Sequence, residues 1–404
     1  MNISNEKRLL FLTAQARISE DKLSQVRHLI SLSLDWDRIL ESAFSQGVAP
    51  LLYNNFKNIN EKHCIPREVM DRLQRAYHGN IARNMYIYDE LLRIVKAFSD
   101  KKVKVIVLKG ATLAKIVYGD IGLRSMLDID LLVKQEDLVR AKEIMSDINY
   151  VAERNVQPEA WYRKNHYHLP RYMHKEKPIV VEIHWHITRN FFSPDIEKWW
   201  GRARHIKLNG CNITVPSPED IITHLCLHLY NHGYNSRMIL REICDINETL
   251  NHYQEEINWA LFHEEINKHG LQKPVYSILY LVEKFYGCTE RPLQMHLPKP
   301  YHFDVKFKLV KILEKRMLTE DDAFSDIPTE FVKSLVAGTF WGKMRLLWPT
   351  IFPPREVISK RYSIPSSSNM IFLCYLIRPF RLLTKYGKHL LTIFRIREKK
   401  NGVV

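Results

Sequence analysis

The stretch VKVIVLKGATLAKIVYGDIGLRSMLDIDLLV, residues 103–133, decides the fold class of this chain. It opens with a short β-branched run, Val103–Leu108, which is typical of a buried strand. A segment of helical composition follows at Ala111–Tyr118, and Leu127–Val133 is a second candidate strand. The order strand, helix, strand predicts a compact region in which helices pack on a sheet.

Further candidate elements lie downstream of this stretch. Glu136–Met145 is expected to be an amphipathic helix, Ile179–Ile187 (IVVEIHWHI) a third strand, and Cys211–Val215 a fourth. The rest of the chain up to about residue 320 is expected to be helical. The predicted helices are Leu23–Leu34, Trp36–Phe44, Arg67–Phe98, Pro218–Gly233, Arg237–Asn251, Trp259–Lys268 and Pro274–Tyr286.

These elements predict a mixed α+β fold with a small β-sheet and flanking helices. We expect four parts: a helical N-terminal region at 1–95, a sheet domain at 96–215, a helical domain at 216–340, and a tail at 341–404. Prolines interrupt the start of the tail, and its end is basic and amphipathic.

The composition is that of an ordinary globular protein. Of the 404 residues, 46% are hydrophobic and 26% are charged. The six cysteines include no CxxC pair, which argues against a disulfide framework and a zinc ribbon. No apolar run approaches the roughly 20 residues of a membrane-spanning helix. We therefore expect a cytoplasmic protein, with peripheral membrane contact as an alternative.

The formal charge of +15 is concentrated near the C-terminus. Ile371–Val404 contains eight Lys or Arg residues and a single acid, Glu398, which gives +7 in 34 residues. Apolar residues recur along the same segment. The pattern is typical of a helix that binds an anionic membrane surface or a nucleic acid, and a helix docked on the protein itself remains open.

Asp128-Ile129-Asp130 is the first motif that carries chemistry. In a strand, residues i and i+2 point to the same face, so the two carboxylates converge. Adjacent carboxylates repel each other unless a cation lies between them, and oxygen ligands suit Mg²⁺. The motif therefore predicts a metal-binding pair, although a solvated strand end would give the same pattern.

The third strand adds an acidic residue to this pair. Glu182, His184 and His186 share one strand face, and an acid inside an apolar strand is costly unless it is paired or binds a metal. Beside the Asp128–Asp130 strand, Glu182 would complete a site for two Mg²⁺ ions, with Mn²⁺ as an alternative. His184 would contact this site or a bound nucleotide.

Lys109-Gly110 lies between the first strand and the following helix. Glycine lets the backbone approach a phosphate, and a helix N-terminus attracts negative charge. Lys109 would add a positive charge there. A Lys-Gly dipeptide alone is not specific. Here it follows a predicted strand and precedes a helix, and the strands that carry Asp-x-Asp and Glu182 come next, which makes the arrangement specific.

With these motifs the chain resembles the nucleotidyltransferase family proteins of the DNA polymerase β-like superfamily. The similar segments are residues 104–133, VVEIHWHI, SPEDIITHLCLHLYNHG, LREICDI, FPPREVISKRY and YLIRPFRLL. The resemblance implies a nucleotidyltransferase-type sheet, with Gly110 at the glycine turn, Asp128 and Asp130 as the metal pair and Glu182 as the third carboxylate. The group is often associated with exopolysaccharide or peptide-modification gene clusters.

Two features depart from the wider superfamily. Its turn usually contains Gly-Ser or Gly-Gly, but here Ala111 follows Gly110, so a hydroxyl that often contacts the triphosphate is missing. The 17 residues between Gly110 and Asp128 also form an unusually long loop. Arg124 in this loop is a candidate phosphate contact, and the alternative is a surface arginine.

The resulting prediction is a Mg²⁺-dependent nucleotidyltransferase. It would transfer a nucleoside monophosphate from an NTP to an acceptor (a small molecule, a saccharide or a peptide) and release pyrophosphate. Lys109, Gly110, Arg124 and His184 would bind the nucleotide. The alternatives are a non-catalytic binding protein with the same fold, and a toxin-like nucleotidyltransferase that acts on RNA.

Two patterns lie on the predicted helices beyond the sheet. His224, His228 and His232 recur every four residues on one helix face. Hydrogen bonds within the domain interface are the main interpretation, and zinc binding or a phosphate contact are the alternatives. Arg241 and Asp245, four residues apart, are expected to form a salt bridge along one helix.

Overall fold

The computed structural model describes residues 3–59, 64–153, 162–163, 166–188, 193–232, 236, 238–287, 313, 344, 347–348, 350–365 and 367–395. The chain divides into two compact units. One contains Met1–Tyr230 and Arg237–Lys299, and the other contains Asn231–Ser236 and Pro300–Val404. The four parts expected from the sequence remain a prediction.

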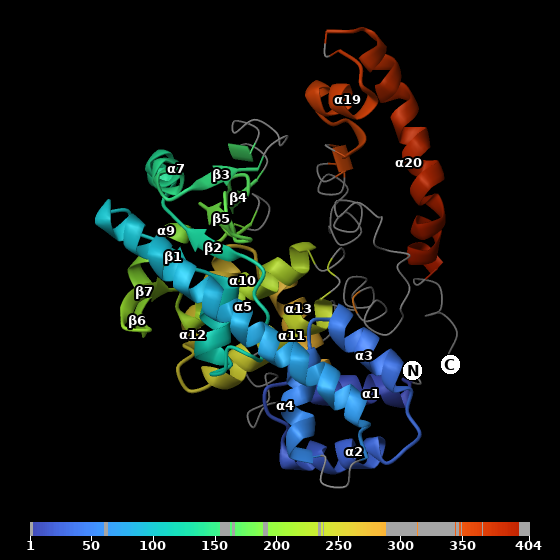
Figure 1. The fold of residues 1–404 in the computed structure, drawn as a ribbon. Coiled ribbons are helices and arrows are strands. Elements are labelled where there is room, and N and C mark those ends of the chain that lie inside the picture. The colour runs from blue at the N-terminus through green and yellow to red at the C-terminus, as the bar shows by residue number, and fades with distance from the viewer. Residues whose placement is uncertain are drawn as a thin grey trace. The chain divides into compact units, whose positions relative to one another are not determined.

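The first unit begins with helices, as the sequence predicted. Capping side chains fix two of their starts: Ser4 Oγ accepts from the Lys7 amide at 3.4 Å, and Asp35 Oδ1 accepts from the Arg38 amide at 3.0 Å. Figure 1 shows the last of these helices, α5, leading from the N-terminal helices to the sheet. The helices are α1 (Asn5–Thr13), α2 (Glu20–Ile30), α3 (Trp36–Ser45), α4 (Ala49–Ile59) and α5 (Arg67–Asp100).

A small mixed sheet follows, and it confirms the predicted fold class. Its strand order is β1-β2-β5-β4-β3, in which β2 and β5 are parallel and every other pair is antiparallel. The parallel pair lies at the centre of the sheet, next to β1. The strands are β1 (Ile106–Val107), β2 (Ile129–Leu132), β3 (Tyr150–Ala152), β4 (Tyr172–His174) and β5 (Val180–His184).

The strands are shorter than the sequence predicted. Leu127 is the first residue of the predicted second strand, but it precedes β2 and is 51% exposed. Cys211–Val215 is indeed a strand, β7, but it pairs with β6 (Arg204–Leu208) in a separate two-stranded sheet. The strands β3, β4 and β6 were not predicted from the sequence. β3 and β4 have three residues each, which leaves little periodic signal.

One hydrophobic core joins α5, the sheet and the helix α7 (Leu138–Asp147). Ile129 and Leu131 of β2 and Ile183 of β5 are fully buried in it. Since strand side chains alternate between faces, Asp130 and Glu182 point to the other side of the sheet. Between β1 and β2 the chain forms the short helix α6 (Lys109–Thr112) and one π-helical turn, Leu113–Val117.

Apart from α9 (Ile196–Arg202), which was not predicted from the sequence, the remaining helices of this unit begin close to the predicted residues. Ser217 Oγ accepts from the Asp220 amide at 3.3 Å, which fixes the start of α10 just before Pro218. The predicted cap of α10, Gly233, lies outside the described residues. The helices are α9 (Ile196–Arg202), α10 (Pro218–His232), α11 (Ile239–His252), α12 (Trp259–Lys268) and α13 (Gln272–Tyr286).

The second unit contains α19 (Arg355–Tyr362) and α20 (Met370–Arg395), which contact each other. Tyr375 in α20 donates to the carbonyl of Pro353 just before α19, with an O–O distance of 2.6 Å. Within the described part of the chain, no helix combines the length and the apolar character that a membrane crossing requires.

Candidate active site

The turn after β1 brings Lys109 and Gly110 to the edge of the sheet. Lys109 adopts a positive φ of 42°, which is uncommon for a residue with a side chain. Gly110 is packed closely: a Cβ atom at this position would lie 2.7 Å from Arg124 Nη1. The glycine therefore leaves room for the Arg124 guanidinium, where the sequence suggested room for a phosphate.

The register of β2 and β5 brings two of the predicted carboxylates together. Asp130 and Glu182 are direct partners in the parallel pair, and both are buried. Asp128 precedes β2 by one residue and is partly exposed. We call Asp128, Asp130 and Glu182 the carboxylate cluster. Their predicted metal-binding and catalytic roles remain predictions.

His184 belongs to the same group. Its Nε2 lies 2.9 Å from Asp130 Oδ1 and 3.5 Å from Glu182 Oε2. Among the described residues, Asp130, Glu182 and His184 form the group whose ligand atoms lie within 4.8 Å of one another, close enough to hold a metal ion. His168, to which the sequence analysis gave no role, forms an isolated β-bridge with His184.

Two cations balance the charge of the carboxylate cluster. Lys109 Nζ lies 3.3 Å from Asp130 Oδ1, and Arg171 Nε donates to Glu182 Oε1 at 2.9 Å. Arg171 is not among the site residues predicted from the sequence. It lies just before β4, a three-residue strand without a clear pattern, so nothing local placed it beside β5.

The carboxylates differ in electrostatic environment although they are neighbours. The pKa of Asp128 is raised to about 6, mainly by burial and secondly by the negative charge of Asp130. Burial also acts to raise the pKa of Asp130, but Lys109 and His184 outweigh it and hold that pKa well below its usual range. This crowding of negative charge is the condition that a bound cation relieves.

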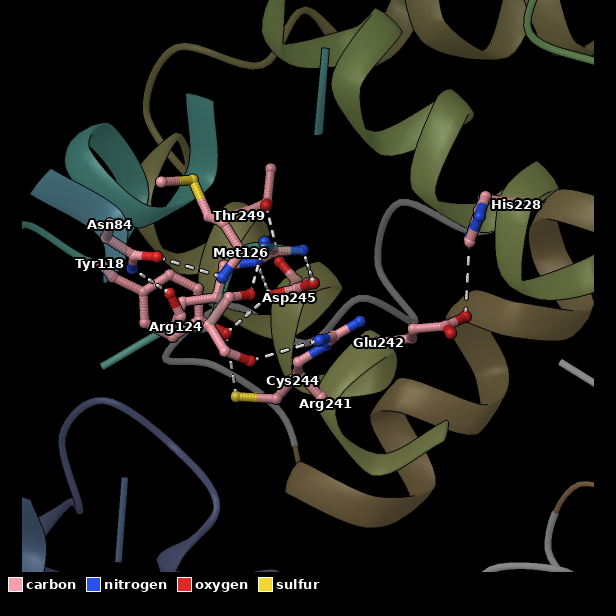
Figure 2. Close-up of polar contacts among 11 residues, drawn as sticks. Asn84, Tyr118, Arg124, Met126, His228, Arg241, Glu242, Cys244, Asp245 and Thr249 are labelled. Atoms are coloured by element: carbon pink, nitrogen blue, oxygen red, sulfur yellow. Dashed lines mark hydrogen bonds and ion pairs between the residues drawn. The ribbon is translucent and has the colours of Figure 1, made fainter. Parts of the chain in front are cut away.

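Arg124 does not reach into the pocket as a free phosphate contact. Its Nε and Nη2 donate to the two carboxylate oxygens of Asp245, each at 2.8 Å, and Tyr118 donates to Asp245 at 2.9 Å (Figure 2). The predicted salt bridge between Arg241 and Asp245 is therefore wrong. A bidentate guanidinium–carboxylate pair is stronger than a pair with a single contact. Asp245, in α11, therefore binds Arg124 rather than Arg241.

A pocket of about 110 Å³ lies between the start of β2 and the helices α10 and α11. Lys109, Gly110, Asp128 and Asp130 line one side. The other side, which we call the helix wall, consists of Leu225, His228, Arg241, Glu242 and Asp245. Arg124, Ser125 and Leu127 complete the lining.

Arg241 stands out on the helix wall. Its Nη1 donates to Ser125 Oγ at a long 3.4 Å, and its buried Nε has no hydrogen-bond partner among the described residues. Burial and the nearby charge of Arg124 lower the pKa of Arg241. A buried donor without a partner is costly, so the position favours an anion that the protein does not itself supply.

The histidines of α10 occupy three different environments. His224 is buried, His228 lines the pocket with its Nδ1 3.6 Å from Glu242 Oε2, and His232 is exposed. None of them belongs to the metal-ligand group of the described residues. His224 makes ring contacts with Trp199 and His228, and its expected interface hydrogen bond stays a prediction. The position of His228 offers it as a contact for a molecule in the pocket.

Comparison with known proteins agrees with this geometry. A family model described as "uncharacterised nucleotidyltransferase" matches residues 33–287, which is more than half of the chain. The chain belongs to this nucleotidyltransferase family. No curated protein and no solved structure matches it.

The part that matches the nucleotidyltransferase family contains the whole candidate site. It runs from α3 to the end of α13, and so includes the carboxylate cluster, Lys109, Arg124 and the helix wall. Membership of this family supports a transferase role in general terms. It also confirms the resemblance predicted from the sequence. The helices α19 and α20 lie outside the matched residues.

Proposed function

We propose that this chain is a metal-dependent nucleotidyltransferase that transfers a nucleoside monophosphate from an NTP to an acceptor and releases pyrophosphate. The observation that carries the proposal is the direct pairing of Asp130 with Glu182 on two parallel strands, with Asp128 two residues before Asp130. An acceptor oxygen bonds to the α-phosphorus, the bond to the β-phosphate oxygen breaks, and the acceptor proton passes to a carboxylate.

The residues of the site fit divalent cations. Carboxylate oxygens of Asp128, Asp130 and Glu182 would hold Mg²⁺, and the imidazole of His184 adds a nitrogen donor that Mn²⁺ accepts more readily. When bound, such ions neutralise the charge on the phosphates and activate the acceptor oxygen. Lys109 would then be released from Asp130 to contact the nucleotide.

Three Lys or Arg side chains line the pocket where the triphosphate would lie, and two of them are candidates to contact it. Lys109 comes from the turn after β1, and Arg241 comes from α11 on the helix wall. Arg124, whose donors are used by Asp245, would instead hold the helix wall against the Gly110 turn. We therefore assign to Arg241 the phosphate contact that the sequence analysis assigned to Arg124.

A second candidate function is the binding of a partner without catalysis. Its support is the pairing of Lys109 with Asp130 and of Arg171 with Glu182, since these cations already compensate part of the cluster's charge. In this reading the carboxylates and cations stabilise the fold, and no divalent ion is needed. Metal-dependent NTP binding separates the two functions.

The first experiment is transfer of label from each of four α-³²P-labelled NTPs with Mg²⁺ or Mn²⁺, using an extract of the source cells to supply acceptors. We compare the wild type with Asp128→Asn/Asp130→Asn. Asp147→Asn is the control, because Asp147 is an exposed acid remote from the pocket lining. Transfer and pyrophosphate release should disappear only in the double variant.

If no transfer is detected, calorimetry in the same buffers shows whether the chain binds NTP. Metal-dependent NTP binding without transfer means that the acceptor is missing from the extract. If no NTP binds with either metal, the transferase proposal is wrong and the non-catalytic alternative is favoured.

A further inference from the structure

The helix α20 exposes an unusually apolar face. Leu376 is 70% exposed and Phe380 is 71% exposed, and Phe372 and Leu383 are each 59% exposed. Single exposed apolar residues are common on protein surfaces, but a continuous set usually marks an interaction site. These four residues, together with Leu373 at 53% exposure, form what we call the apolar stripe.

The spacing of the apolar stripe places it on one side of the helix. Relative to Phe372, Leu376, Phe380 and Leu383 follow at four, eight and eleven residues, which is the repeat of a single helix face. The opposite side packs within the unit: Ile371 is fully buried, and Arg378 donates to the carbonyl of Thr350 at 3.1 Å and 3.0 Å. The stripe is therefore not the face that α20 uses to pack on its own unit.

The charge of α20 is entirely positive. The sequence from Met370 to Arg395 contains no Asp or Glu. Arg381 and Lys385 are exposed and belong to the polar side of the helix, away from the stripe. Two copies of α20 packed through their stripes would bring together two helices that carry only positive charge, so self-association is disfavoured electrostatically.

We propose that α20 docks on an anionic lipid surface. An apolar face combined with basic residues on the polar face is the arrangement of helices that lie in the plane of a membrane interface. The apolar stripe would enter the boundary between headgroups and acyl chains, and Arg381 and Lys385 would contact anionic headgroups. This surface lies outside residues 33–287, so the docking is a property separate from the nucleotidyltransferase match.

The test is flotation of the full-length chain with two kinds of vesicle: phosphatidylcholine alone, and equal parts of phosphatidylglycerol and phosphatidylcholine. The wild type should float with the anionic vesicles, much less with the neutral ones, and less as the salt concentration rises. Leu376→Gln/Phe380→Gln removes the apolar contact without changing charge, and should weaken binding about 30-fold or more. Met85→Gln, at a 60% exposed position of α5, is its control.

A second pair of variants isolates the charge. Arg381→Gln/Lys385→Gln should weaken binding to anionic vesicles by about 30-fold, because each basic residue near such a surface contributes roughly five-fold. Lys104→Gln/Lys207→Gln removes two exposed charges from the other unit and should leave binding unchanged. All substituted positions are exposed, and circular dichroism verifies that each variant remains folded.

Three results would overturn the proposal. The first is equal flotation of the wild type and Leu376→Gln/Phe380→Gln. The second is equal binding to neutral and anionic vesicles, or to neither. The third is a wild-type dimer in analytical ultracentrifugation that Leu376→Gln/Phe380→Gln dissociates while no vesicles bind, which would make the stripe a contact between copies of this chain.

Discussion

In the carboxylate cluster, Asp130 and Glu182 meet because adjacent parallel strands place them in register, whereas on the helix wall Asp245 takes its partner, Arg124, from 121 residues earlier in the chain. The cluster concentrates negative charge that Lys109 and Arg171 compensate through single contacts. The pair of Asp245 and Arg124 is bidentate and buried. The first arrangement can exchange its cations for metal ions, and the second is suited to holding the pocket's shape.

The largest expected effect is on the rate of transfer. It compares the carboxylate cluster with the helix wall by removing one carboxylate charge from each. Glu182→Gln should lower transfer about 10³-fold, because it removes an electrostatic contribution to the transition state. Glu242→Gln, on the helix wall, should lower it less than about 10-fold. Initial rates of pyrophosphate release measure both. Equal losses in the two variants would show that the distinction between cluster and wall is wrong.

The next effect concerns stability on the helix wall. Asp245→Ala leaves the guanidinium of Arg124 buried without its carboxylate, and should lower the free energy of unfolding by about 3–5 kcal/mol. Asp71→Ala, which breaks the surface pair of Arg67 and Asp71, should change it by less than about 0.5 kcal/mol. Denaturant unfolding followed by circular dichroism measures both.

A double variant checks the cause of that loss. Arg124→Met/Asp245→Leu replaces both charges with apolar groups, and should therefore lose less stability than Asp245→Ala alone. If the double variant were less stable than Asp245→Ala, the ion pair itself would stabilise the fold, and the loss in Asp245→Ala would not come from the unpaired charge of Arg124.

A third prediction uses another carboxyl group of α11, that of Glu248. Burial, and to a lesser extent the charge of Asp245, raise the pKa of Glu248 to about 7, although its Oε1 accepts from the Ala16 amide at 3.2 Å. The folded protein thus binds this proton more tightly than the unfolded chain, whose pKa is near 4.5. The stabilisation is complete below pH 4.5 and is lost as the pH rises through about 7.

Glu248→Gln keeps the side chain neutral at every pH. Above pH 7 the variant should be more stable than the wild type by about 3 kcal/mol, and the difference should vanish near pH 4. Denaturant unfolding across this pH range measures it, with Glu264→Gln at an exposed position as the control. A difference that does not vary with pH would contradict the prediction.

The smallest expected effect tests the phosphate contact assigned to the helix wall. Arg241→Gln should weaken Mg²⁺-dependent NTP binding about 10- to 100-fold, the range for one hydrogen bond to a charged group. Arg75→Gln, at an exposed position of α5, should leave the affinity unchanged. Calorimetry measures both. Unchanged affinity in Arg241→Gln would remove the helix wall from triphosphate recognition.

Much of the fold was predictable because the relevant signals are local. The start of α10 follows from Ser217 and Pro218, and α12 coincides with the predicted Trp259–Lys268. The predicted second and third strands contain β2 and β5. The three-residue strands β3 and β4 were missed because they are too short for alternation to be recognised.

The candidate site was predictable in part for the same reason. Asp130, Glu182 and His184 were identified because alternation along a strand decides which side chains share a face. No sequence pattern indicates that Arg171 lies beside Glu182, or that Arg241 rather than Arg124 keeps an unpaired donor in the pocket.

By itself, the sequence determined the mixed fold class, the nucleotidyltransferase family and the strands that carry the carboxylate cluster, because these depend on consecutive residues and on spacing within single elements. Only the tertiary structure decided which cation meets which carboxylate. Asp245 has Arg241 one helical turn away, yet it pairs with Arg124, because α11 packs against the π-helical turn Leu113–Val117 and so brings Asp245 to the loop that carries Arg124. A buried carboxylate is best stabilised by a partner that donates to both of its oxygens. Which residue can do so depends on how segments that are distant in the sequence pack together.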